Sequence, residues 1–311
     1  MKSEAVVSVI VPTYNRPERL RRALQSIQRQ TYDNIEVVVV DDHSDESPEH
    51  VIDSLSSDLS VKFVRHSENK GANAARSTGI IKSCGQYVAF LDDDDTWESE
   101  KIKAQVQELE NSDAGVSYTG IRQIDGENNI IHESNPIISG DITKKLLERN
   151  PVGTFSTVLV DREVIYQAGL PDERFPIWQD KEWYIRLSKN TKFKPVPEIL
   201  VNHHVESGDR ISDGFTDLEK KALPLFLKKF QDDIKRRGEY GGRPIYSSVY
   251  SDVSRYGLST GNPDKAKEYA TKALVKYPAN IKAIICFVLA MHDGYLYEKY
   301  RKINKIFSLQ T

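Results

Sequence analysis

Residues 87–95 read Tyr-Val-Ala-Phe-Leu-Asp-Asp-Asp-Asp, an apolar run that passes directly into four consecutive aspartates. The apolar part has the near-continuous hydrophobicity of a strand that is buried on both faces of a parallel sheet. Residues 35–42, IEVVVVDD, repeat the arrangement and end in Asp41 and Asp42. In parallel α/β sheets, ligands bind beyond the carboxyl ends of the strands. These two runs therefore predict an α/β fold with a binding site at one edge of its sheet.

Strand-like and helix-like patterns alternate on either side of these two runs. The expected strands span residues 6–11, 35–40, 61–64, 87–91 and 115–118, and the expected helices begin near residues 17, 48, 71 and 96. A strand, a helix and a strand, repeated four times, predict a doubly wound α/β layer with right-handed crossovers. Further on, Asp125-Gly126 is a turn signal that predicts a hairpin between residues 121–124 and 129–132.

The chain changes character near residue 216, after which only helical patterns occur. Residues 246–256, 263–277 and 281–306 have apolar positions at helical spacing. The first two segments resemble one tetratricopeptide helical hairpin, with small residues where two helices approach closely. One such repeat is too few for a free-standing array, so we expect a helical appendage. We therefore predict an α/β domain over residues 1–215 and an α-helical region over residues 216–311.

The composition of the 311 residues excludes several classes of protein. Lys and Arg number 43 against 46 for Asp and Glu, so the net charge of −3 offers no electrostatic footprint for nucleic acid. Cys84 and Cys286 form neither a disulfide framework nor a metal-binding pair, which is typical of a reducing compartment. The N-terminus lacks a signal-peptide pattern, and the longest apolar stretch, 283–291, is shorter than the ~18 residues of a membrane span. We therefore expect a cytoplasmic protein that does not bind nucleic acid.

The aspartates of the two strand ends would repel one another in a partly desolvated cleft unless a cation compensates their charge. Closely spaced carboxylates suit Mg²⁺ or Mn²⁺, hard cations that bridge protein oxygens and substrate phosphates. The pattern thus indicates a nucleoside diphosphate held through a divalent metal. Structural explanations compete with this one. Asp41-Asp42 could form only a turn, and Asp95 with Glu98 could form the capping box of a helix over residues 96–110.

Five motifs, in order and at similar spacing, resemble the inverting glycosyltransferases of family 2, which have the GT-A fold. The motifs are VSVIVPTYNR at 7–16, QTY at 30–32, VVDDHS at 39–44, NKGANAAR at 69–76 and FLDDDD at 90–95. The resemblance spans roughly residues 6–212. It implies an α/β domain of the GT-A (Rossmann-like) type with a C-terminal α-helical extension, and a nucleotide-diphosphate sugar as donor.

The resemblance also assigns roles on the donor side of the site. The residue that matches Asp42 hydrogen-bonds the nucleotide base, and backbone near Pro12 lines the base pocket. The family's Asp-x-Asp motif falls on Asp92, toward the ribose, and on Asp94, the principal metal ligand. The implied substrate-binding residues are Pro12, Tyr14, Asp42, Asn69, Arg76, Asp92, Asp93 and Trp183, and the implied ligands of Mn²⁺ or Mg²⁺ are Asp92, Asp94 and His204.

An inverting transfer needs a carboxylate that takes the proton of the acceptor hydroxyl. Residues 178–187, WQDKEWYIRL, resemble the family's Glu-Asp-x-x-x-x-x-Arg-Leu helix, in which the aspartate is the catalytic base. Asp180 is therefore the expected base, and Glu182 is the second choice. Gln179 stands where the family usually has glutamate, and a helix N-cap is the structural alternative for Asp180.

Aromatic and histidine side chains flank this segment. Trp178, Trp183 and Tyr184 could stack on the apolar faces of sugar rings or pack in the core. His203 and His204 precede a polar loop, and in the family a histidine on this segment can approach the diphosphate or the metal. His204 matches that position better than His203, and simple solvation of the pair is the alternative.

The resemblance implies transfer of a single sugar to a hydroxyl of a glycan or lipid-linked acceptor, since the Gln-x-x-Arg-Trp motif and membrane helices of polymer-forming relatives are not visible. Residues 281–307 mix aromatic and basic side chains and predict weak contact with an anionic membrane, although packing against the catalytic domain explains the apolar residues equally well. Two other functions compete. One is a catalytically idle GT-A scaffold that binds partners through its helices. The other is a signalling receiver domain that would use Asp92 and Lys194.

Overall fold

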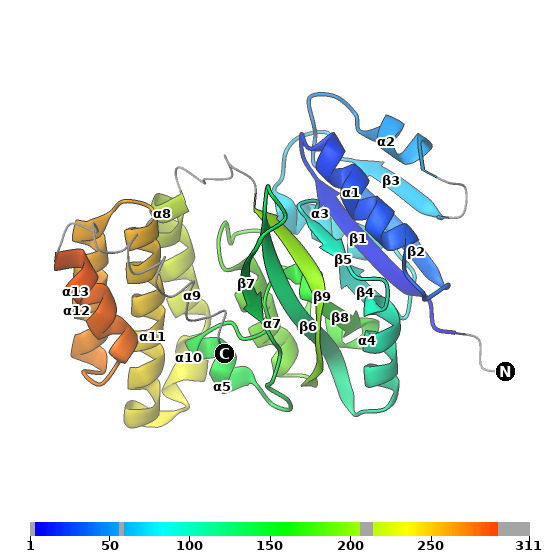
Figure 1. Ribbon diagram of the computed structural model, residues 1–311. Coiled ribbons are helices and arrows are strands. Elements are labelled where there is room, and N and C mark those ends of the chain that lie inside the picture. The colour runs from blue at the N-terminus through cyan, green and yellow to red at the C-terminus, as the bar shows by residue number, and fades with distance from the viewer. Residues whose placement is uncertain (1–3, 56–58, 206–213, 292–311) are drawn as a thin grey trace. The chain divides into compact units, whose positions relative to one another are not determined.

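The computed structural model describes residues 4–55, 59–205 and 214–291 (Figure 1). The chain divides into two compact units. The first runs through Met1–Thr143, Pro151–Glu173 and Glu182–Gly208, and the second through Lys144–Asn150, Arg174–Lys181 and Asp209–Thr311. Two short segments that precede the helical region in the sequence, 144–150 and 174–181, thus belong with the helices rather than with the α/β layer.

Within the described residues, a nine-stranded mixed sheet forms the first unit. Its strands are β1 Val7–Thr13, β2 Ile35–Asp41, β3 Val61–Arg65, β4 Tyr87–Phe90, β5 Asp95–Trp97, β6 Ala114–Asp125, β7 Ile130–Ser134, β8 Val158–Asp161 and β9 Lys192–Val205. Their order is β3-β2-β1-β4-β8-β6-β9-β5, and β7 pairs with β6. Because β1 is parallel to both β2 and β4, the strand order reverses at β1 and three carboxyl ends meet at one edge.

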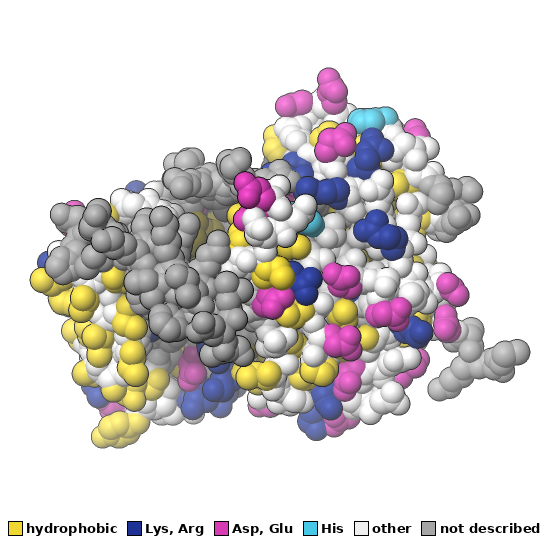
Figure 2. All heavy atoms as spheres, viewed as in Figure 1, with side chains coloured by type: hydrophobic (Ala, Val, Ile, Leu, Met, Phe, Trp, Pro, Cys, Tyr) yellow, Lys and Arg dark blue, Asp and Glu magenta, His cyan; other side chains and the backbone are white. Residues whose placement is uncertain are grey.

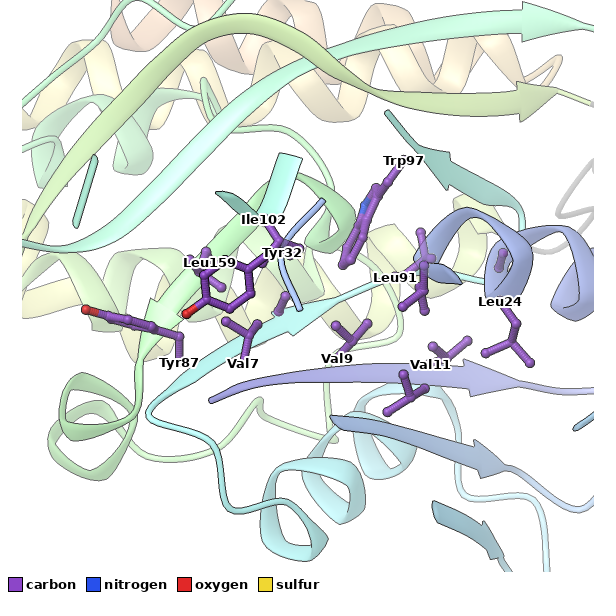
Figure 3. Packing of buried hydrophobic residues seen from close by; sticks show 14 of the residues in the cluster. Val7, Val9, Val11, Leu24, Tyr32, Tyr87, Leu91, Trp97, Ile102 and Leu159 are labelled. Carbon is purple, nitrogen blue, oxygen red and sulfur yellow. The ribbon is translucent and has the colours of Figure 1, made fainter. Parts of the chain in front are cut away.

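Helices of the first unit pack on this sheet. They are α1 Pro17–Gln28, α2 Glu49–Asp53, α3 Ala72–Lys82, α4 Lys101–Glu110 and α6 Arg162–Ala168. On one face, Val9 of β1 and Leu24 of α1 belong to the same apolar cluster (Figure 3). On the other face, Val38 of β2 packs in a cluster with Ala75 of α3. Burial on both faces explains why these strands are apolar at nearly every position.

The second unit is helical. Its elements are α5 Thr143–Glu148, the first turn of α7 Gln179–Ser188, α8 Gly214–Asp217, a π-helical turn at Leu218–Ala222, α9 Leu223–Lys229, α10 Gln231–Lys235, α11 Gly238–Ser259, α12 Pro263–Lys276 and α13 Ile281–Met291. The close approach of α11 and α12 needs small residues, since a Cβ on Gly257 would lie 3.3 Å from the Cβ of Ala266. Exposed apolar side chains gather at the end of α12 and on α13 (Figure 2): Val275, Tyr277, Ile281, Ile284, Val288 and Met291. The expected helix beyond Met291 lies outside the described residues.

One expectation for the α/β layer is wrong. Asp95 lies in β5 and does not cap a helix, because the chain after the acidic run first pairs with β9 as a short strand. Helix α4 begins only at Lys101, so Asp95 and Glu98 form no capping box for it. The hairpin expected around Asp125-Gly126 is confirmed by the pairing of β6 with β7.

Two further observations bear on the competing classes of protein. A receiver domain has the strand order 2-1-3-4-5, which is not the order of this sheet. Lys194, the lysine that a receiver would need, pairs instead with Glu108 at 3.4 Å. Among the described residues, no helix combines the length and the apolar character needed to cross a bilayer.

Candidate functional site

Three neighbouring strands bring their carboxyl ends together at one edge of the sheet. β1 ends at Thr13, β2 at Asp41 and β4 at Phe90. The Asp42 amide donates to the Thr13 carbonyl over 2.9 Å, which ties the end of β2 to that of β1. The Thr13 hydroxyl donates to Asp93 Oδ2 over 2.9 Å, which ties in the acidic run after β4. Both acidic clusters therefore lie at the edge where the sequence predicted a binding site.

The Asp42 carboxylate holds the loop that follows β3. Its Oδ1 accepts from the Lys70 amide at 2.9 Å, and its Oδ2 accepts from the Gly71 amide at 2.7 Å. Nδ1 of His66 lies 2.7 Å from Oδ1. The Asp42 side chain is almost wholly buried. Asp42 thus fixes this loop beside the strand end, and its implied contact with a nucleotide base stays a prediction.

The Asp41 carboxylate stabilises the turn that Asp41 begins. Its Oδ1 accepts from the Ser44 amide at 3.1 Å and from the Ser44 hydroxyl at 2.5 Å. Arg65 Nε lies 3.4 Å from the other oxygen. The Ser44 hydroxyl oxygen also accepts from the Asn15 amide at 2.8 Å, where Asn15 has a φ of 55°. This turn joins the loops that follow β1 and β2.

Arg76 and Ser156 hold the first aspartate of the second cluster. Arg76 Nη2 donates to Asp92 Oδ1 over 2.5 Å, and its guanidinium lies 4.1 Å from the centre of the Phe155 ring. The Asp92 amide donates to the Ser156 hydroxyl over 3.0 Å. Arg76 and Asp92, both predicted to bind substrate, are thus in contact with each other. The Arg76 guanidinium balances the charge of Asp92 without a metal.

Asp93 is buried beside Arg16. Arg16 Nη1 lies 3.1 Å from Asp93 Oδ1 and 3.7 Å from Asp94 Oδ2. Burial raises the pKa of Asp93 to about 6, although Arg16 and the Thr13 hydroxyl act in the opposite direction. Arg16 belongs to the first motif of the sequence. Its contact with the acidic run follows from the pairing of β1 with β4, which the sequence alone does not specify. It places a half-exposed positive charge at the edge of the acidic run.

The pairing of β5 with β9 places a histidine against the last aspartate. Asp95 is the register partner of His203, and His203 Nδ1 lies 2.7 Å from Asp95 Oδ1. This hydrogen bond raises the pKa of His203 to about 9, against the opposing effect of burial. Burial raises the pKa of Asp95 to about 6, against the opposing effect of His203. Without a metal, the imidazole is therefore protonated at neutral pH.

Asp94, Asp95 and His203 form a group that fits a divalent cation. One ligand atom from each lies within 4.8 Å of the others. Oδ2 of Asp95 is buried and has no hydrogen-bond partner in the part of the chain that the structure describes, which leaves its lone pairs for a cation. Burial, followed by the neighbouring charge of Asp92, raises the pKa of Asp94, because these carboxylates are crowded. Two carboxylates and one imidazole are a reasonable donor set for such a metal, once His203 has lost its proton.

The group differs from the predicted ligands, which are Asp92, Asp94 and His204. Only Asp94 is common to the two sets. The Asp92 carboxylate is already paired. His204 Nε2 lies 2.9 Å from Thr96 Oγ1, and its amide donates to the Asp94 carbonyl over 3.1 Å. Since successive residues of a strand face opposite sides of a sheet, only one of the two histidines can face Asp95, and the register selects His203.

Trp183 is a core residue. It is fully buried, and its ring lies 5.4 Å from that of Phe90 and 5.6 Å from that of Phe155. Its indole N–H donates to the Gly169 carbonyl over 2.9 Å. A ring with no exposed surface offers no face to a sugar. This corrects the expectation that Trp183 binds substrate.

The other predicted nucleotide contacts are distributed along the same edge. Pro12 is buried within β1, whereas Tyr14, just beyond the end of that strand, is 43% exposed. Asn69 is exposed on the loop that Asp42 holds. Their contacts with a nucleotide remain predictions.

The expected base lies in the first turn of α7, in the second unit. Nδ2 of Asn150 donates to Asp180 Oδ2 over 2.8 Å, and the Lys181 amide donates to Asp180 Oδ1 over 2.7 Å. Glu182, the second choice, is fully buried and accepts from Arg186 Nε over 2.6 Å. Glu182 therefore stabilises the helix, and Asp180 stays the predicted base.

A sequence profile of the family described as "Glycosyl transferase family 2" matches residues 8–169, more than half of the chain. The chain belongs to glycosyltransferase family 2. The matched region contains the ends of β1, β2 and β4 and the whole acidic run. It stops before Asp180 and His203, so the assignment of those two residues depends on the structure and on the motif around residue 180.

Proteins similar to this chain are named as glycosyltransferases. An uncharacterized glycosyltransferase of Nostoc, alr2836, is 31% identical over 252 residues, 76% of this chain and 78% of that protein. The Escherichia coli UDP-Glc:alpha-D-GlcNAc-diphosphoundecaprenol beta-1,3-glucosyltransferase WfgD is 30% identical over 184 residues, 59% of this chain and 69% of that protein. An uncharacterized glycosyltransferase of Rickettsia bellii is 34% identical over 150 residues, 48% of this chain. The chain spans between 22% and 36% of the length of three such Rickettsia proteins.

Solved structures agree with this glycosyltransferase in fold. S. aureus TarS 1-349 matches 94% of this chain, and 91% of its own chain, with a TM-score of 0.61 at 15% identity. Its complex with UDP-GlcNAc matches 94% of this chain, and 92% of its own, with a TM-score of 0.58 at 17% identity. Identities this low establish the fold alone. They confirm the expected α/β GT-A architecture with a C-terminal helical region.

Proposed function

We propose that this protein is an inverting glycosyltransferase that moves one sugar from a nucleotide-diphosphate sugar to an acceptor hydroxyl, with metal assistance and with Asp180 as general base. Family membership supplies the reaction class. The cluster of Asp94, Asp95 and His203 carries the proposal, because it offers a buried carboxylate oxygen without a hydrogen-bond partner among the described residues. That oxygen lies next to the strand ends at which α/β sheets bind ligands.

The donor side would be built from the first unit. Asp94, Asp95 and His203 would hold Mn²⁺ or Mg²⁺, and the bound metal would neutralise the charge of the departing nucleoside diphosphate. Arg16 keeps Asp93 and Asp94 in place through its contacts at 3.1 Å and 3.7 Å. Asp42 holds the loop after β3 against the strand ends, so that Pro12, Tyr14 and Asn69 can form the nucleotide pocket.

Asp180 would act on the acceptor. In a single in-line displacement, the acceptor oxygen forms a bond to the anomeric carbon while the bond to the diphosphate breaks. The hydroxyl proton passes to the Asp180 carboxylate. Hydrogen bonds from Asn150 and from the Lys181 amide favour the ionised carboxylate, which is the form that accepts a proton.

The names of similar proteins support a choice of substrates. WfgD is named for UDP-Glc and for an acceptor linked to diphosphoundecaprenol, and TarS has been crystallised with UDP-GlcNAc. We therefore infer a UDP-hexose donor and a lipid-linked or other cell-envelope glycan as acceptor. Contact of residues 281–307 with an anionic membrane would suit such an acceptor, and the exposed apolar residues of α13 are consistent with it. If the protein does not co-sediment with anionic vesicles at low salt, the proposed membrane contact is wrong.

A panel of nucleotide-sugars tests the donor and the metal together. We expect UDP-glucose or UDP-N-acetylglucosamine to raise the melting temperature with Mn²⁺ or Mg²⁺, since a ligand at a hundred times its Kd stabilises by about 2.7 kcal/mol. EDTA should abolish both this stabilisation and the release of UDP. If no nucleotide-sugar stabilises the protein or is turned over, the proposed function is wrong.

The base is tested separately. Asp180→Asn should retain the stabilisation by UDP and Mn²⁺ and lose turnover by about 10²–10⁴-fold, the usual contribution of a general base. Near-full turnover by this variant would show that another group takes the proton.

A further inference from the structure

The carboxylate of Asp180 is held by a side chain from a distant part of the second unit. Asn150 follows α5 and donates from Nδ2 to Asp180 Oδ2 over 2.8 Å. The Lys181 amide donates to the other oxygen over 2.7 Å. Because the two groups donate to different oxygens, together they fix the plane of the carboxylate.

Helix α11 contacts the backbone on both sides of this pair. The Ser248 hydroxyl donates to the Glu148 carbonyl over 2.8 Å, two residues before Asn150. Lys181 Nζ donates to the same carbonyl over 3.5 Å and lies 3.7 Å from Asp252 Oδ2, also on α11. One helix therefore fixes both the loop that carries Asn150 and the helical turn that carries Asp180.

The surroundings of Lys181 keep its side chain beside Asp252 of α11. Its side chain is buried, and Nζ lies 5.4 Å from the centre of the Trp178 ring and 5.0 Å from that of Phe226. Burial lowers the pKa of Lys181, Asp252 and Asp180 act to raise it, and Lys282 acts to lower it. A buried ammonium is costly unless it is paired, so Lys181 must stay near Asp252.

The backbone before α7 carries a further constraint. Trp178 has a φ of 62°, a conformation that is strained for a bulky residue, and its ring packs edge-on to Phe226 of α9 at 5.4 Å. The strained residue lies two positions before Asp180. Such strain persists only where the surrounding packing requires it.

We propose that Asn150 is a positioning residue for Asp180 and that α11 holds the backbone that carries both residues, so that the helical unit fixes the orientation of the proposed base. This rests on the proposed function only in naming Asp180 the base. On this proposal the helical unit contributes to catalysis by holding the proposed base.

The first test is Asn150→Ala. With the UDP-sugar selected by the panel, we expect turnover to fall on the order of tenfold. The acidic limb of the pH–rate profile should move upward by up to about one pH unit, since the ionised carboxylate loses a donor. The affinity for UDP with Mn²⁺ should not change. Asn150→Asp should move the limb further, because it adds a like charge. A variant that only perturbed the fold would lower turnover without moving the limb.

Asn129→Ala is the matched control. Asn129 Nδ2 also donates to a carboxylate, that of Asp125 at 3.3 Å, but in the exposed hairpin of the first unit. It should change neither turnover nor the profile. An unmoved acidic limb in Asn150→Ala would overturn the proposal.

A titration separates this proposal from the proposed function. The ¹³C signal of the Asp180 carboxyl, identified as the signal that Asp180→Asn removes, should titrate at higher pH in Asn150→Ala than in the wild type. This holds even if no nucleotide-sugar is turned over, in which case only the proposed function fails. Identical titration midpoints of the Asp180 carboxyl in Asn150→Ala and in the wild type would show that Asn150 does not position Asp180.

Lys181→Met tests the part played by α11. Methionine keeps the apolar bulk of the lysine stem, and Asp252 keeps Lys282 as a partner, so the variant should fold. We expect turnover to fall at least severalfold with unchanged affinity for UDP and Mn²⁺. Full turnover would show that α11 does not position the base.

Discussion

The two acidic strand ends look alike in sequence but differ in what their carboxylates do. At the end of β2, Asp41 and Asp42 accept hydrogen bonds from backbone amides and a hydroxyl, and Arg65 and His66 lie beside them. Among the residues that the structure describes, Oδ2 of Asp41 has no hydrogen-bond partner, but Arg65 Nε lies 3.4 Å away. These carboxylates hold a turn and a loop, and their charges are balanced by the protein itself.

The end of β4 is different. Arg76 pairs with Asp92 and Arg16 with Asp93, but three further groups, Asp94, Asp95 and His203, crowd together. One buried oxygen there has no hydrogen-bond partner in the described chain. We infer that a run of aspartates suits a cation where the fold leaves ligand atoms without hydrogen-bond donors. Substituting equivalent residues in the two clusters should therefore give opposite results.

The largest effect is expected from Asp94→Asn. It removes a ligand from the proposed metal group, so UDP release should fall on the order of 10²-fold or more, and the Mn²⁺-dependent rise in melting temperature should disappear. Without metal, the variant should be as stable as the wild type or slightly more stable, since one of several crowded charges is gone. Differential scanning fluorimetry with and without Mn²⁺, combined with a UDP-release assay, measures both. Retention of the Mn²⁺ effect would remove Asp94 from the ligand set.

Asp42→Asn, the same chemical change at the other cluster, should cost stability. An asparagine has one acceptor oxygen, so the amide of Lys70 or of Gly71 loses its partner beside a buried side chain. The free energy of unfolding should fall by about 1–3 kcal/mol. Urea denaturation without metal measures it, with Asp94→Asn as the reference. Equal stability of the two variants would mean that the clusters do not differ in the way described.

Much of the fold could be predicted from the sequence because its signals are local. Strands buried on both faces are apolar at nearly every position, and their ends are marked by Asp41-Asp42 and by Asp92 onward. The error at Asp95 came from the same local reasoning. An aspartate three residues before a glutamate satisfies a capping rule, but the short pairing of β5 with β9 is a contact over more than a hundred residues.

The site was less predictable for the same reason. His203 and His204 are adjacent, and the family resemblance favoured His204, whereas the register of β5 on β9 places His203 opposite Asp95. Asn150 has no recognisable motif at all. Lys101 resembles a solvent-facing helical lysine, yet it is fully buried, its Nζ lies 4.0 Å from the centre of the Trp97 ring, and burial lowers its pKa well below the usual value.

A third carboxylate, Glu36 at the amino end of β2, also accepts hydrogen bonds from the protein. Of the three carboxylates, we expect its substitution to change stability least. Glu36 Oε1 accepts from the Ser8 hydroxyl at 2.5 Å, the Cys84 amide at 2.6 Å and the Gly85 amide at 2.9 Å. Burial raises its pKa, but these hydrogen bonds outweigh burial and lower the pKa below 4.5. Glu36 therefore stabilises the fold above pH 4.5, and this contribution is lost as the pH falls through the folded-state value.

Glu36→Gln should weaken the fold by only about 0.5–1 kcal/mol at pH 7, because the glutamine oxygen can still accept from the same three donors and only the charge is lost. Urea denaturation at pH 7 and near pH 3 measures the difference between variant and wild type, which should shrink at the lower pH. A difference that persisted or grew near pH 3 would contradict this sign. A carboxylate that accepts hydrogen bonds from amides stabilises the fold, whereas a crowded carboxylate does not. We therefore expect Glu36→Gln to lower stability, as Asp42→Asn does, and Asp94→Asn not to lower it.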